Sequence, residues 1–204
     1  MGKDMASSDA PFGFIPYGEV LRARTYAVNT APTVAIAVGD LVVAGGAVVA
    51  TPAMGRLMDI EDSAYPASTA PFLGAILAVF DENMFPVAYL AASEAGNGTI
   101  AGYVLVADHP YQQFLAQEDG VANAIDLDEG GQNADVIGTH TPTAANNYHG
   151  KMEIDSSSAG TGAALAVKLV APHMDDTPAD DSNPNARWIC QINEHYYGST
   201  IAGV

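Results

Sequence analysis

Residues 72–117 constrain the fold most, because they hold the longest apolar runs of the chain between its sharpest turn signals. The apolar run 72–80 is too short to span a bilayer, and it ends at a polar turn, residues 81–83. Further on, β-branched and aromatic side chains in residues 103–107 favour a pleated strand, which Pro110 terminates. This alternation of short strands and turns predicts an antiparallel meander, a scaffold without a recognisable reaction centre.

The rest of the chain continues this pattern of short apolar runs and turns. Residues 33–60 hold short valine- and alanine-rich runs, and residues 187–197 read as a closing strand. One helical turn is expected at residues 133–138, and long loops at 139–162 and 172–184. We therefore predict an all-β protein, an antiparallel β-barrel or β-sandwich with an extended N-terminal arm and long loops. Residues 1–32 would form the arm and residues 33–204 a single β-rich domain.

The predicted arm interleaves large apolar side chains with glycine and proline. Each large apolar side chain gains about 1.5 to 3 kcal/mol on burial, so these residues should find a surface, either on their own domain or on a neighbour. Two arginines follow at strand spacing and form the most concentrated positive spot of a chain with 7 basic residues. Together they could contact an acidic patch of a neighbouring subunit. The candidate contact residues are Phe12, Phe14, Ile15, Pro16, Tyr17, Arg22 and Arg24.

The chain is strongly acidic, with 24 acidic against 7 basic residues and a formal net charge of −17. Nucleic-acid binding depends on lysine and arginine displacing counterions, so we expect no contact with DNA or RNA and none with anionic membranes. The charge itself indicates either solubility or an outward face that docks a basic partner. The N-terminus lacks the apolar core of a signal peptide, so synthesis in a cytoplasm is expected.

No pattern of catalytic, metal-binding or cofactor-binding residues emerges. Cys190 alternates with Trp188 and Ile192 on one strand face, which favours a buried, inert thiol. No two histidines have the spacing of HExxH, no GxSxG elbow is present, and the acidic run 126–131 lacks EF-hand spacing. We therefore expect neither a cofactor nor enzyme activity. A hydrolase that pairs two loop carboxylates is a rival which activity screening would reveal.

Three sequence segments resemble a family of tailed-bacteriophage virion proteins that decorate or cement the capsid. They are GAILAVFDENMFPVAYLAAS, GYVLVADHPYQQFLAQEDG and ARWICQINEH. Glycine precedes a YVLVAD-like strand, proline follows it, and a tryptophan-bearing strand ends in Ile-Asn-x-His. His109 stands where the family pattern has a second acidic residue. The matching positions are Gly102, Tyr103 to Asp108, Pro110, Phe114, Trp188, Ile192, Asn193 and His195.

The resemblance implies a virion structural protein that binds the outside of the assembled phage head and stabilises its lattice. Its partners would be the major capsid protein and further copies of itself, with a trimer favoured over a dimer. It would be made in the host cytoplasm and end on the outer surface of the capsid. The alternative is a carbohydrate-binding or adhesion β-sandwich module of a phage particle, with Tyr111 or Tyr148 contacting the glycan.

Overall fold

The structure of the chain is a computed structural model. It describes residues 9–28, 32, 34–51, 53–60, 71–92, 100–120, 125–126, 129–138, 149–173 and 185–198. The regular secondary structure of the described residues is almost all β-strand, with a short 3-10 helix, η3 (Ser156–Ser158), which confirms the predicted all-β class. Within these ranges, no helix is long and apolar enough to cross a membrane. The predicted loop residues 139–148 and 174–184 lie outside them.

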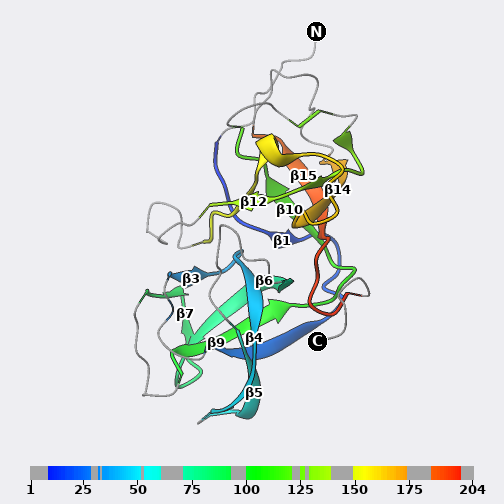
Figure 1. The fold of residues 1–204 in the computed structure, drawn as a ribbon. Coiled ribbons are helices and arrows are strands. Elements are labelled where there is room, and N and C mark those ends of the chain that lie inside the picture. Colours follow the sequence, from blue (N-terminus) through cyan, green and yellow to red (C-terminus); the bar gives the residue numbers. More distant parts are fainter. Residues whose placement is uncertain are drawn as a thin grey trace.

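Five strands close into a small barrel, the lower part of the molecule in Figure 1. The order around the barrel is β4 (Leu41–Thr51), β5 (Gly55–Ile60), β2 (Ala23–Val28), β9 (Gly102–Ala107) and β6 (Phe72–Asp81). β6 then pairs with β4 and completes the ring, while β7 (Pro86–Val87) pairs with β6 outside it. Only the β2–β5 pairing is parallel among the pairings of these strands. A short pair, β3 (Ile36–Ala37) with β8 (Tyr89–Leu90), forms a separate sheet that packs against β6, with Ile36 and Leu90 buried among side chains of the ring.

A five-stranded antiparallel sheet forms the upper part of the molecule (Figure 1). Its order is β1 (Ile15–Pro16), β10 (Gln113–Gln117), β15 (Arg187–Ile192), β14 (Val167–Pro172) and β11 (Asn133–Ala134). Trp188, Cys190 and Ile192 alternate along β15, and all three are buried in one apolar core with Phe14 and Phe114. The predicted strand face of Trp188 and Cys190 is therefore confirmed. β12 (Val136–Ile137) pairs with β13 (Glu153–Ile154) beside this sheet.

The helical turn expected at residues 133–138 is wrong, because this segment forms β11 and β12. Ala134 and Val136 are both buried, which is the alternation of a strand. Asn133 also exchanges two backbone hydrogen bonds with Gly160, and its strand pairs with β14. These long-range bonds and the burial of two apolar side chains outweigh the weak local preference for a helical turn.

The described part of the predicted N-terminal arm is built into the fold. β2 is a strand of the barrel wall, paired with β5 on one side and β9 on the other, and β1 is an edge strand of the upper sheet. Between them the chain passes from one sheet to the other, as the blue trace in Figure 1 shows. The structure thus differs from the expected extended arm, because backbone pairing with β10, β5 and β9 and the burial of Phe14 and Tyr26 hold the segment on its own domain.

Candidate docking surface

Residues 12–24, which we call the strap, connect the upper sheet with the barrel. The strap starts beside the barrel, where the backbone N–H of Phe14 donates to the carbonyl of Gly39 (2.7 Å). It then follows β10, where the N–H of Tyr17 donates to the carbonyl of Gln113 (2.8 Å). Further on, the N–H of Leu21 donates to Oε1 of Gln112 (2.9 Å), before β2 begins. Hydrogen bonds at three points therefore fix the path of the strap.

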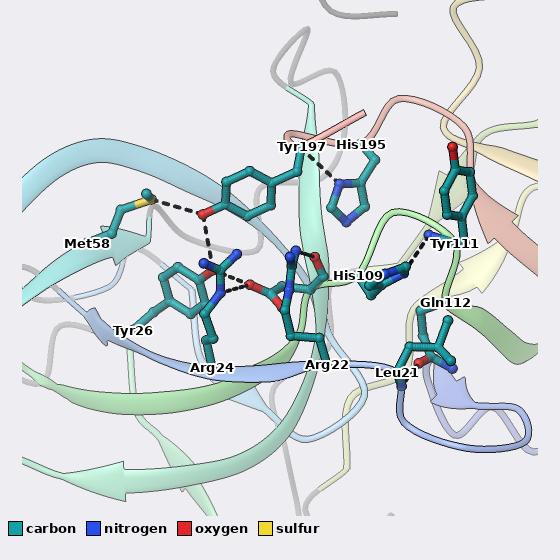
Figure 2. A network of polar contacts seen from close by, with 11 residues as sticks. Leu21, Arg22, Arg24, Tyr26, Met58, His109, Tyr111, Gln112, His195 and Tyr197 are labelled. Carbon is teal, nitrogen blue, oxygen red and sulfur yellow. Dashed lines mark hydrogen bonds and ion pairs between the residues drawn. The ribbon is translucent and has the colours of Figure 1, made fainter. Parts of the chain in front are cut away.

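Large apolar side chains remain exposed along the strap and on the turn that holds it. We call this set the apolar strip, and its members with their exposed fractions are Ile15 (47%), Tyr17 (38%), Val20 (47%), Leu21 (52%) and Tyr111 (69%). Gln112, which binds the Leu21 backbone, is the neighbour of Tyr111, so this hydrogen bond ties the turn of Tyr111 to the strap (Figure 2). A group of exposed apolar side chains on a fixed backbone is typical of a protein-binding surface.

A buried ion-pair network lies beside the apolar strip, where β9 ends (Figure 2). The carboxylate of Asp108 is fully buried and accepts hydrogen bonds from Nε of Arg22 (2.8 Å) and Nε of Arg24 (2.6 Å). The hydroxyl of Tyr26 donates a third one, at 2.5 Å. Burial alone would raise the pKa of Asp108, but the hydrogen bonds from Tyr26 and the two arginines outweigh it and hold the pKa below its ordinary value.

The network also includes the segment that follows β15. The guanidinium carbons of Arg22 and Arg24 lie 5.2 and 4.8 Å from the centre of the Tyr197 ring, within the range of cation–π attraction. The hydroxyls of Tyr197 and Tyr26 are 3.3 Å apart. Burial, together with the hydrogen bond to Asp108, raises the pKa of Tyr26. Because Tyr197 also packs against the core inside the barrel, the network ties the C-terminal part of the chain to β2 and β9.

His195 joins the two sheets just before Tyr197. Its Nδ1 accepts a hydrogen bond from the backbone N–H of Tyr197 (3.0 Å), and the ring is buried. Its neighbours Glu194 and Tyr196 exchange backbone hydrogen bonds with Phe72, the first residue of β6. Burial lowers the pKa of His195 to about 4, so the ring is neutral at physiological pH. These contacts make the network a structural clasp between the barrel and the upper sheet.

The structure separates the seven predicted contact residues into three groups. Ile15 and Tyr17 are exposed and belong to the apolar strip, while Phe12 and Pro16 are half-buried and Phe14 is 1% exposed. Arg22 and Arg24 form ion pairs with Asp108 of their own chain. Their contact with a neighbouring subunit stays a prediction, although their side chains remain 36% and 45% exposed.

The sequence did not place Leu21, Tyr111 and Asp108 together with the strap. A signal for Leu21 exists, because two arginines at strand spacing place the residues between and beside them on the opposite face. Asp108 is separated from its partners by more than 80 positions, so no local pattern announces the ion pairs. Tyr111 follows Pro110 in a turn, where an exposed aromatic residue carries no periodic signal.

The remaining candidate groups are buried or dispersed. Cys190 is fully buried, as predicted, and burial raises the pKa of its thiol. Among the residues that the structure describes, no three His, Cys, Asp or Glu side chains are grouped so that they could hold a metal ion. Of the acidic run 126–131, residues 127 and 128 lie outside the described ranges, as does Tyr148.

Comparison with known proteins returns no relative: the chain matches no family model, no curated protein and no solved structure.

Replacing Asp108 with asparagine is expected to lower the free energy of unfolding by about 3 kcal/mol, because a neutral amide leaves both guanidinium groups without their buried counter-charge. Urea unfolding measures the change. Glu19→Gln, which neutralises an exposed carboxylate on the same strap, is the matched control and should change stability by less than about 0.5 kcal/mol. Equal stability of the two variants would mean that the clasp does not hold the sheets together.

Proposed function

We propose that the chain is a structural protein of a tailed-phage head, which binds the outer surface of the assembled capsid and stabilises the lattice. The apolar strip carries this proposal, because it offers five large exposed side chains on a backbone held by long-range hydrogen bonds. A preorganised surface of this kind binds without an ordering cost. The resemblance of the three sequence segments to phage decoration proteins supports the same role.

In this role the protein acts by covering surface, without making or breaking a bond. The apolar strip would pack against the major capsid protein, and the clasp would keep the strip rigid by joining the barrel to the upper sheet. The net charge of −17 disfavours any contact with the packaged genome and favours a capsid partner with basic residues around its apolar patch. Many copies on one lattice would strengthen a modest single affinity through avidity.

The alternative, a carbohydrate-binding module, has less support from the described residues. Tyr111 is exposed and its ring lies 5.8 Å from the His109 ring, as an aromatic sugar platform would require. The nearest side-chain amide, however, is already engaged: Gln112 accepts from the Leu21 N–H and donates to the Gln113 carbonyl. Trp188, the single tryptophan, is buried in the core.

The double variant Tyr17→Ser/Leu21→Ser should weaken binding to phage heads by at least about tenfold, because each removed apolar anchor contributes about 1 kcal/mol or more. Binding is measured by cosedimentation with expanded heads that lack this protein. Point substitutions suit the test better than deletion of residues 1–17, since the deletion would remove buried Phe14 and the whole of β1.

Val170→Ser is the matched control, because Val170 is 40% exposed on β14, away from the strap. It should bind heads as the unmodified protein does. If the unmodified protein does not bind heads, the proposed function fails. If the double variant binds as well as the control does, the apolar strip is not the attachment surface.

A further inference from the structure

The outer halves of β4 and β5 form a two-stranded ribbon that reaches the lower end of the molecule in Figure 1. We call residues 48–51 and 55–58 the ribbon. Within it, Val48 pairs with Met58 and Thr51 with Gly55. The pairing of β4 with β6 is confined to Leu41, Val42 and Val43, and β5 meets β2 only at Asp59 and Ile60. In the described part of the chain, each ribbon strand therefore has one open backbone edge.

A β-bulge makes the ribbon leave the barrel. The register between β4 and β5 shifts between Ala44 and Val48, around Gly45 and Gly46. Gly46 has a φ of 78°, and a side chain on Gly45 would lie 2.8 Å from the carboxylate of Asp59. A bulge of this kind bends its strand and strengthens the local twist. The glycine pair, which has no phosphate-binding context in the sequence, thus sets the direction of the ribbon.

In the described part of the chain, the open edge of the ribbon carries few of the charges that usually prevent pairing with another chain. Native proteins guard open edges with charged residues, inward-pointing charges or covering loops. Here Arg56 is the single charged residue of the ribbon, while Val48 is 60% exposed. In a chain with 24 acidic residues, positions 41–58 contain none. Two copies could therefore meet at the ribbon without bringing carboxylates together.

We propose that the open edge of β4 in the ribbon pairs, antiparallel, with the same edge of a second copy of this chain. A two-fold axis makes one edge complementary to itself, since each copy then donates and accepts the same backbone hydrogen bonds. The β4 edge suits this better than the β5 edge, which would bring two copies of Arg56 close together. The resulting assembly is a dimer, the alternative to the trimer expected from the resemblance, and it forms in solution without a capsid.

Sedimentation velocity over a range of protein concentrations tests the pairing. The unmodified chain should shift from monomer to dimer as concentration rises. Val48→Lys should weaken the dimer at least about tenfold, because each copy would bring an ammonium group into a contact that holds no carboxylate. Val170→Lys, which introduces the same charge at another exposed strand position, should dimerise as the unmodified chain does. A monomer at all concentrations, a trimer, or an unaffected Val48→Lys dimer would each overturn the proposal.

Two further measurements keep the test independent of how well Val48→Lys folds. Cys190 is fully buried, so Val48→Cys adds an accessible thiol, and oxidation with diamide should yield a covalent dimer. Raising the salt concentration from about 0.05 to about 0.5 M should strengthen the unmodified dimer, because it screens the repulsion between two chains of charge −17. Absence of the covalent dimer would overturn the pairing at the β4 edge. A dimer that salt weakens would instead indicate that Arg56 docks on an acidic surface, and edge pairing would be wrong.

Discussion

A chain carrying Gly74→Ala is expected to lose the closed barrel. Gly74 lies in β6, where β6 runs between β4 and β9, and an added Cβ would lie 2.0 Å from the carbonyl oxygen of Ala107. The clashing atom belongs to the backbone of β9, so no side-chain rotation relieves it. Either the β6–β9 pairing opens or the whole strand shifts. We expect a loss of more than about 3 kcal/mol, a large part of the stability of an ordinary domain.

Far-ultraviolet circular dichroism and urea unfolding of Gly74→Ala measure this loss, and Gly160→Ala provides the control. A side chain at Gly160 would meet its nearest neighbour, the carbonyl oxygen of Ser158, at 3.8 Å, an ordinary contact. That variant should differ from the unmodified protein by less than about 0.5 kcal/mol. Equal unfolding midpoints for the two variants would show that β6 and β9 do not approach each other as closely as described.

Several of the strands could be predicted from the sequence, because they follow from local composition. The apolar run 72–80 corresponds to β6, residues 103–107 to β9, and the closing strand to β15. Closure of the barrel could not be predicted in this way. It depends on the pairing of β4 with β6 and on the parallel pairing of β2 with β5, contacts between segments far apart in the sequence. Neither hydrophobic periodicity nor turn chemistry specifies such partners.

The candidate surface could be predicted only in part, for a physical reason. Burial stabilises an apolar side chain equally on its own domain and on a neighbouring subunit. Composition therefore could not show which residues of the strap pack inward and which remain for a partner. The pairing of β1 with β10 decides between them. It turns Phe14 into the core and leaves Ile15 exposed on the other face. The two arginines looked available for a partner, but Asp108, at the end of a strand from the middle of the chain, already binds both.

Acidification from about pH 8 to about pH 5 is expected to stabilise the protein, because buried carboxyl groups bind protons more tightly in the folded chain than in the unfolded chain. Burial raises the pKa of Asp40 to about 7, although the N–H of Ala37 donates to its carboxylate. Glu118 also has a pKa of about 7: burial and the nearby charges of Asp119 and Glu129 raise it, against hydrogen bonds from two backbone N–H groups.

Glu153 is the third carboxyl group of this kind. Burial and the charges of Asp9 and Asp119 raise its pKa to about 7, while Lys151 on the same side acts in the opposite direction. Ordinary carboxyl groups of an unfolded chain have pKa values of about 4. Between about pH 4 and 7 the folded protein therefore holds protons that the unfolded chain has released. The stability that each group contributes is complete below about pH 4 and is lost as the pH rises through 7.

His195 opposes this trend over part of the range. Its pKa is lowered to about 4 in the folded protein, so below pH 6.5 the unfolded chain takes up a proton that the folded chain excludes. The folded chain binds about three more protons at the carboxyl groups and about one fewer at His195 than the unfolded chain does. The net difference of about two protons stabilises the folded state on acidification. Each is worth roughly 1 kcal/mol per pH unit. Below about pH 4 the trend reverses, because the pKa of Asp108 is lowered in the folded protein. The unfolded chain then binds a proton that the folded Asp108 excludes, and the clasp opens as the pH falls through the lowered pKa.

Urea unfolding at four pH values between about 5 and 8 measures this slope, and Asp40→Asn identifies its source. An asparagine can keep the hydrogen bond from the Ala37 N–H but cannot titrate. The slope of the unfolding free energy against pH should therefore correspond to about one bound proton fewer. Val170→Ser, which changes no titratable group, should leave the slope unchanged. A stability that rises from pH 5 to 8 in the unmodified protein would contradict the burial of these three carboxyl groups, because solvated carboxylates impose no such penalty on the folded chain at neutral pH.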